Sequence, residues 1–251
     1  MKRGRVYHST RQIDKNYMKY FDGKDVCRYY LGWSGEYLKY GDNLAAPRKD
    51  FRLYSTPRIL VRQIPAKRPY CVHACFTDEV ALNDLNSMNI INIPEKPEYV
   101  LGVLNSRLVS WWFVHKFGKM QRETFPQFKV NELGDFPLPT NGIKHRDEIA
   151  KLAAQILTAK RRNPAADTTA LEKDIDRLLY ELYGLTPEEC AIVETERQRL
   201  LGPNEFGVPD CSFLAVEAIV APEPQPWVAL RWSLNSSTRT SKGRGFLAHR
   251  I

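Results

Sequence analysis

The chain has 251 residues, of which 43% are hydrophobic and 26% are charged, and its formal net charge is +8. This hydrophobic content suffices for a buried core and excludes a chain that is disordered throughout. The charge is uneven, because residues 1–144 contain 23 Lys and Arg against 14 Asp and Glu, whereas residues 145–200 contain 9 against 11. A basic excess of this kind fits a polyanionic partner such as nucleic acid, and a solvated basic face would have the same composition.

Membrane and secretory segments are not expected. The most apolar stretch, residues 99–113, is interrupted by Asn105, Ser106 and Arg107 and falls short of the ~20 apolar residues that a spanning helix needs. The charged amino terminus is followed by no apolar stretch with a cleavage site, so we expect a cytoplasmic protein. Its five cysteines form no CxxC pair, which favours reduced thiols over a disulfide framework.

The first 95 residues are typical of short strands, because Pro, Gly, Asn and Asp interrupt them about every 8–12 residues. The clearest predicted strands are DVCRYYLGW (25–33), RILVRQI (58–64), PYCVHACF (69–76) and MNIINI (88–93). Alternation along the second strand places Arg58 and Arg62 on one face. Alternation along the third strand, residues 69–76, places Cys71, His73 and Cys75 on one face. A zinc site needs a fourth ligand that is not visible, so ordinary strand packing is the preferred interpretation.

A long helix is predicted over about residues 97–117. Pro97 suits a first helical turn, and apolar residues then recur at three- and four-residue spacing. Trp111 and Trp112 lie on this apolar stripe, which favours packing in the core over base stacking or partner contact.

After Pro137 and Pro139 the pattern changes to longer helices. The first is marked by apolar residues at 149, 152, 153, 156 and 157 and ends near 161–164. A second is expected to begin at Thr169, with a capping box to Glu172, and to end at Gly184.

A third helix is expected from Thr186-Pro187-Glu188-Glu189, with another capping box and with Ile192 and Val193 inside. From about residue 201 the sequence is loop-like. Only residues 213–220 and 227–234 suit strands there, and they would form a small hairpin or belong to a poorly ordered tail.

The common catalytic motifs are absent: the chain contains no Walker loop, GxSxG elbow, HExxH or Rossmann glycine fingerprint. Asp22-Gly23-Lys24 has the Asp-x-Lys spacing of a metal-dependent nuclease, in which the acid holds Mg²⁺ and the lysine polarises the phosphate. A convincing second acidic ligand is missing upstream, so a polar turn before a strand is the preferred interpretation.

Taken in order, several segments resemble one family. These are FDGKDVCRYYLGW, YLKYG, RILVRQI, YVLGVLNSRLVSWWF, FPQFKVNELGDFPLP, IAKLAAQILTAKR and LEKDIDRLLYELYGLTPEE. They resemble the TaqI-like carboxy-terminal specificity domain of adenine DNA methyltransferases and of type IIG restriction-modification enzymes. The resemblance covers about residues 10–195 and is carried by the ordered set more than by any one segment.

The resemblance implies an α+β fold: a β-rich target-recognition domain with an inserted long helix, followed by a helical spacer. We expect the recognition domain at 1–144, a helical spacer or docking region at 145–200, and a tail of uncertain structure at 201–251. The S-adenosylmethionine loop and the Asn-Pro-Pro-Tyr motif of the family's catalytic half do not occur in this sequence. The chain is therefore expected to be non-catalytic, and to be either a fragment or a separate specificity subunit.

The implied partners are double-stranded DNA and a methyltransferase or endonuclease domain or subunit, to which the cofactors S-adenosylmethionine and Mg²⁺ would belong. Seven cations of the basic segment are predicted to bind DNA: Lys24, Arg28, Arg58, Arg62, Arg107, Lys119 and Arg122. Arg58, Arg62 and Arg107 are the predicted base readers, because a guanidinium can bind guanine in a bidentate manner. Two alternatives remain: a small nuclease that uses Asp22 and Lys24, and a subunit whose helices chiefly dimerise or dock.

Overall fold

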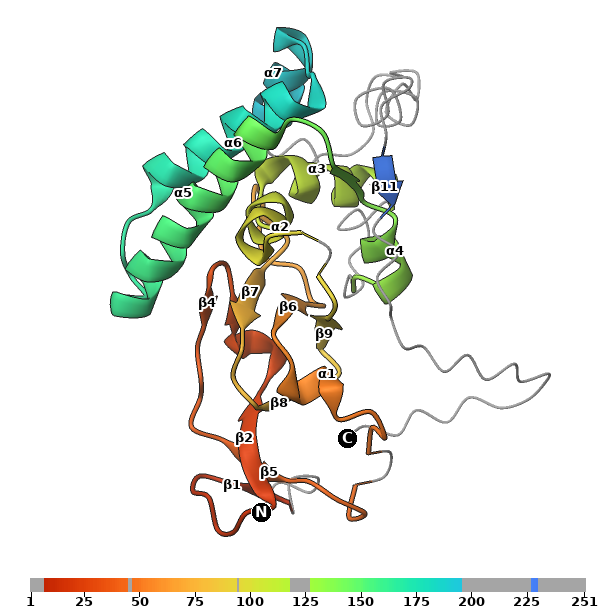
Figure 1. Cartoon of the computed structure of the whole chain (residues 1–251), viewed down its shortest axis with the longest axis vertical. Coiled ribbons are helices and arrows are strands. Elements are labelled where there is room, and N and C mark those ends of the chain that lie inside the picture. Colours follow the sequence, from red (N-terminus) through yellow and green to blue (C-terminus); the bar gives the residue numbers. More distant parts are fainter. Residues whose placement is uncertain (1–6, 45–46, 94, 118–126, 196–226, 230–251) are drawn as a thin grey trace, which may run out of the picture.

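The computed structural model describes residues 7–44, 47–93, 95–117, 127–195 and 227–229. The fold is α+β, as predicted. Short strands occupy one end of the molecule and a group of helices occupies the other (Figure 1).

The sheet farthest from the helices joins four short strands in the order β1-β5-β2-β8. Its strands are β1 (His8–Ser9), β2 (Tyr17–Phe21), β5 (Tyr37–Lys39) and β8 (Leu82–Asn83). The predicted strand over 25–33 is wrong in form. After a short 3-10 helix (Gly23–Asp25), it is a tight hairpin of β3 (Val26–Cys27) and β4 (Tyr30–Leu31). The chain turns at Tyr29, which adopts φ 58° and buries its ring.

A central three-stranded antiparallel sheet has the order β7-β6-β9. Its strands are β6 (Arg58–Arg62), β7 (Ala74–Thr77) and β9 (Ser87–Ile90), and the short helix α1 (Arg52–Ser55) precedes β6. Both faces of β6 are covered: Ile59 and Val61 join the main core, and Leu60 packs in a second cluster with Phe21 and Val26. Arg58, which was predicted to bind DNA, is therefore fully buried.

The predicted 97–117 helix is two helices, α2 (Pro97–Leu104) and α3 (Arg107–Lys116). Asn105 and Ser106 separate them. The Asn105 side chain accepts a hydrogen bond from the Ala74 amide (2.9 Å) and donates one to its carbonyl (3.0 Å). The Ser106 hydroxyl accepts from the Val109 amide (3.2 Å) and so caps a new helix. The polar side chains of Asn105 and Ser106 thus form hydrogen bonds with backbone groups where the first helix ends. The spacing of apolar residues along the sequence does not reveal this break.

The predicted burial of the two tryptophans is confirmed. Trp111 is 6% exposed and Trp112 is 4% exposed. Trp112 makes edge contacts with three phenylalanine rings, at centroid distances of 5.1–5.3 Å: Phe113, Phe117 and Phe136. These aromatic rings therefore pack in the hydrophobic core.

The helices predicted over 145–200 are confirmed for the described residues up to 195, where three helices follow one another with short connections, and residues 196–200 lie outside the described residues. The remaining elements are α4 (Val130–Gly134), β10 (Pro137–Pro139), α5 (Ile143–Arg162), α6 (Thr169–Tyr183), α7 (Pro187–Thr195) and β11 (Trp227–Ala229). The strand β11, within the predicted 227–234, pairs with β10, and residues 213–220 lie outside the described residues. In Figure 1, α5 and α6 run side by side over α2 and α3.

Helix ends follow the sequence in part. Gly184 ends α6 at φ 68°, and Thr186 and Glu189 form the expected capping box through bonds of 2.7 and 3.3 Å. The box expected from Thr169 is wrong, because Thr168 is the N-cap residue and its hydroxyl donates to the Glu172 carboxylate at 2.6 Å.

Burial also departs from expectation on α7: Val193 is buried, whereas Ile192 is 47% exposed.

The central sheet and the helices share the main hydrophobic core, in which α2 lies between the central sheet and α5. At Gly102 the two helices approach closely, since a Cβ there would lie 2.7 Å from Cγ2 of Ile149. The division into a recognition domain and a helical spacer stays a prediction. The main core contains residues from both sides of the proposed boundary at residue 144.

Candidate nucleic-acid interface

Arg58, a predicted base reader, lies inside the protein. Its guanidinium donates to the carbonyls of Ala81 (2.7 Å), Glu79 (2.9 Å) and Thr56 (3.3 Å). Burial lowers the pKa of Arg58 to about 10, because the charged form has lost its water. In this conformation Arg58 ties β6 to the 79–81 segment and presents no surface to DNA.

Arg28 also has an internal role. It pairs with Glu172 of α6 at 2.7 Å and donates to the Asn105 carbonyl at 3.0 Å. Its guanidinium lies 3.7 Å from the centroid of the Tyr70 ring, within the range of a cation–π contact. The residue thereby joins the β3–β4 hairpin to the helices.

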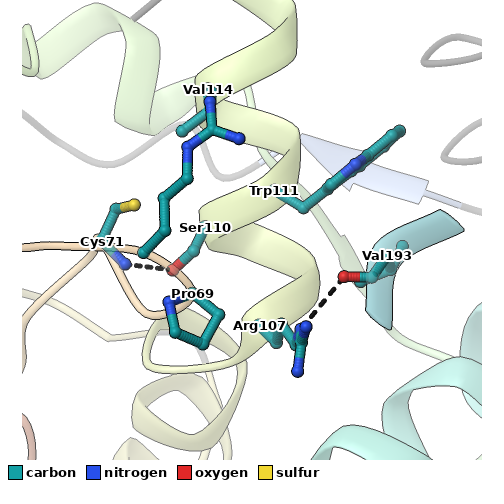
Figure 2. Close-up of a pocket in the computed structure, with 8 residues that line it drawn as sticks. Pro69, Cys71, Arg107, Ser110, Trp111, Val114 and Val193 are labelled. Atoms are coloured by element: carbon teal, nitrogen blue, oxygen red, sulfur yellow. Dashed lines mark hydrogen bonds between the residues drawn. The ribbon is translucent and has the colours of Figure 1, made fainter. Parts of the chain in front are cut away.

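Arg107 connects α3 to α7. Its Nε donates to the Val193 carbonyl at 3.0 Å, as Figure 2 shows, and its guanidinium pairs with the Glu194 carboxylate at 2.6 Å. The adjoining cavity has a volume of about 10 Å³, which is room for one water molecule and not for a base. The placement is that of a structural tie.

Arg62 and Lys24 differ from these three arginines. Arg62 ends β6 and is half-buried, and its side chain makes no hydrogen bond or ion pair within the described residues. The Lys24 side chain is 60% exposed, and its ammonium lies 3.8 Å from the Asp22 carboxylate. The protein therefore constrains these two side chains less than it constrains Arg28, Arg58 and Arg107.

The surroundings of Arg62 are electropositive and contain an unused polar atom. The pKa of His73 is lowered to about 4 by burial, with smaller contributions from Arg28 and Arg62. Nδ1 of His73 is buried and has no hydrogen-bond partner among the described residues. His73 is therefore neutral near pH 7 and adds no positive charge beside Arg62.

The two other predicted binding residues, Lys119 and Arg122, lie outside the described residues. The DNA-binding role of all seven residues stays a prediction.

Five further exposed cations were missed by reasoning from strand and helix patterns, because all lie in loops. They are Arg11, Lys15, Arg48, Lys49 and Lys67, none of whose side chains has an ion pair within the described residues. We call the sheet β1-β5-β2-β8 the distal sheet. Residues 10–16, which precede β2, and residues 41–44 and 47–50, which follow β5, adjoin the same end of this sheet, where the Tyr40 amide donates to the Asn16 carbonyl at 2.8 Å. We call the four cations of these two loops, Arg11, Lys15, Arg48 and Lys49, the basic tip.

The candidate metal positions were also located. Asp22 precedes the short Gly23–Asp25 helix, and its amide donates to the Asp25 carboxylate at 2.9 Å. Over the described ranges, no group of three His, Cys, Asp or Glu side chains is arranged to hold a metal ion. At Cys75, burial raises the pKa of the thiol to about 12, which suits a packed strand residue.

Comparison with protein families bears on the part of the chain that contains these cations. Residues 18–138 match the model of the TaqI-like C-terminal specificity domain. These residues belong to that family. A TaqI-like specificity domain is a DNA-recognition module of restriction-modification systems, so DNA and a catalytic module are its partners. No curated protein matches the chain.

The matched range runs from within β2 to within β10 and includes the broken α2–α3 pair. Within the described residues, none of the helices has the length and apolar character needed to cross a membrane.

Proposed function

We propose that this chain reads a specific DNA sequence for an adenine-methylating or type IIG restriction-modification system and carries out no chemistry itself. The TaqI-like specificity domain over 18–138 is the observation that supports this most directly. Methyl transfer and cleavage would belong to a separate methyltransferase or endonuclease module, which would bind S-adenosylmethionine and Mg²⁺.

Within this function, the recognition domain is residues 1–144, and residues 145–200 brace it and set its distance from the catalytic module. Of the seven predicted cations, Arg62 and Lys24 are the described residues best placed for DNA, since Arg28, Arg58 and Arg107 are bound within the protein. An available guanidinium suits base readout, and an exposed ammonium suits a phosphate.

Selection from a randomised duplex library tests the proposal. The full chain should enrich one sequence and bind it at least 10³-fold more tightly than a scrambled duplex, as is typical of specific DNA binding. Equal affinity for every duplex would contradict the proposal.

A second measurement addresses catalysis. The chain should transfer no labelled methyl group from S-adenosylmethionine and should cut no DNA with Mg²⁺. Cleavage that requires Mg²⁺ and is abolished by Asp22→Ala would instead establish the nuclease alternative.

A further inference from the structure

The loop of residues 63–73 joins β6, which ends at Arg62, to β7. It carries the exposed Lys67. The loop is closed by a bond from the Ala66 amide to the Cys71 carbonyl at 2.9 Å. At its start, the Gln63 amide donates to the Asn86 carbonyl at 2.7 Å. The backbone of Arg62 belongs to β6, and its amide donates to the His73 carbonyl at the end of the loop at 2.9 Å. The conformation of the loop therefore decides where Lys67 lies relative to Arg62.

The far side of the loop is attached to α3. The Ser110 hydroxyl accepts from the amides of Cys71 (2.9 Å) and Val72 (3.3 Å), and Figure 2 shows the loop lying along this helix. These backbone bonds hold the end of the loop and leave Tyr70 just before them.

Tyr70 extends from the loop to α6. Its hydroxyl donates to Oδ2 of Asp176 at 2.8 Å, and its ring lies under the Arg28 guanidinium. Arg28 is in turn paired with Glu172, one turn before Asp176 on the same helix. One side chain of the loop is thus held by two residues of the helical region, through a direct bond and through a stacked cation.

Asp176 binds two parts of the protein at once. Its side chain is almost fully buried, and Oδ1 accepts from the Arg107 amide at 2.9 Å, at the start of α3. Groups that face it are Arg28 and Tyr29 from the hairpin, Tyr70 from the loop, Arg107 from α3, Glu172 and Tyr180 from α6, and Glu194 from α7. A buried carboxylate with two strong acceptor bonds fixes geometry more than it adds stability, because removing it from water is costly.

We propose that Tyr70 and Asp176 are positioning residues for DNA recognition: through them, helix α6 fixes the 63–73 loop so that Arg62 and Lys67 meet DNA in one arrangement. This inference rests on the proposed function and deepens it, since it makes the helical region part of the recognition apparatus. A pre-ordered loop loses less conformational entropy when it binds, and it discriminates between sequences more sharply than a mobile one.

Two conservative variants test the inference. Tyr70→Phe removes only the hydroxyl and keeps the ring under Arg28, and Asp176→Asn keeps the shape of the side chain. Matched controls are Tyr37→Phe on β5 and Asp174→Asn, which is exposed on α6, since neither side chain has a hydrogen bond in the described part of the chain.

The expected result has two parts. The ratio of affinities for the selected duplex and its scrambled counterpart should fall about tenfold in Tyr70→Phe and Asp176→Asn, as the loss of a charge-assisted hydrogen bond implies, and stay unchanged in the controls. Amide hydrogen exchange should accelerate in residues 63–73 and not in the distal sheet, because a purely structural loss would accelerate exchange across the whole core.

The contradicting outcomes are distinct. If the parent chain selects a sequence and both variants retain its specificity ratio and loop exchange rates, the positioning inference is wrong and the proposed function stands. If the parent selects no sequence, the proposed function fails, and the inference fails with it.

Discussion

Arg58 and Arg62 occupy the two ends of the same strand and yet have opposite environments. Arg58 is enclosed and its guanidinium is bound by three carbonyls, whereas Arg62 is half-buried and its side chain has no hydrogen-bond or ion-pair partner among the described residues. The two residues differ in what packs over their ends of the strand. The 79–81 segment covers the end at Arg58 and not the end at Arg62. A cation that the protein already binds stabilises the fold, and a cation that it leaves unbound is available to DNA.

The largest expected effect is on stability at the enclosed end. Arg58→Met should lower the free energy of unfolding by roughly 3–5 kcal/mol, because the three carbonyls lose their buried donor. Urea denaturation measures this, with Arg62→Met as the matched control, for which a change within about 0.5 kcal/mol is expected. Equal losses at the two positions would remove the contrast between them.

The next effect is the pH dependence that Asp176 confers. Burial is the main cause that raises the pKa of Asp176 from 3.8 to about 6, so the folded state binds this proton more tightly than the unfolded state. Its contribution to stability is therefore fully present below pH ~4 and is lost as the pH rises through about 6. The loss amounts to about 3 kcal/mol.

Unfolding measured from pH 4 to 7.5 on the parent and on Asp176→Asn isolates this contribution. The stability of the parent relative to the variant should fall with rising pH across that window. A constant difference between the two proteins would show that Asp176 does not titrate there.

The third effect concerns binding at the exposed end. Arg62→Ala should weaken binding to the selected duplex by about 1–3 kcal/mol and relax specificity at one base pair. Lys24→Ala should weaken all duplexes alike, because a phosphate contact carries no sequence information. Titrations against duplexes with single base-pair changes separate the two patterns, and a uniform loss for Arg62→Ala would reassign it to the backbone.

The smallest effect per residue is expected at the basic tip. Reversing all four charges of the basic tip to Glu should weaken every duplex and reduce the salt dependence of binding, by up to about 0.9 in log–log slope for each phosphate that is no longer neutralised. The control reverses four exposed cations of the helices: Lys144, Lys151, Arg162 and Lys173. An equal change in slope for the two sets would mean that net charge, and not the tip, is responsible.

Sequence reasoning located the α+β class and most helix ends, because amphipathic periods and capping residues are local signals. Gly184 and the Thr186–Glu189 box are of this kind. The break at Asn105 was missed, since its side chain bonds Ala74, which lies 31 residues away in the sequence.

The candidate site was less predictable, because it too depends on contacts between residues that are far apart in the sequence. Arg58, Arg62 and Arg107 are alike in sequence. The partners of Arg58 and Arg107 come from the 79–81 segment and from α7, which no local pattern reveals. Lys67 lies in a loop, where neither the helical nor the strand periodicity of side chains predicts which residues are exposed.

The central claim is tested most directly by the same substitution at the two ends of β6. Arg58→Lys and Arg62→Lys both keep the charge and remove the planar fork that makes several directed bonds. The measurements are the free energy of unfolding and the affinity ratio for selected over scrambled duplex. We predict that Arg58→Lys loses stability and retains the ratio under conditions in which it is folded, whereas Arg62→Lys retains stability and loses the ratio about tenfold or more. An unchanged ratio in Arg62→Lys, or a lost ratio in a fully stable Arg58→Lys, would contradict the account.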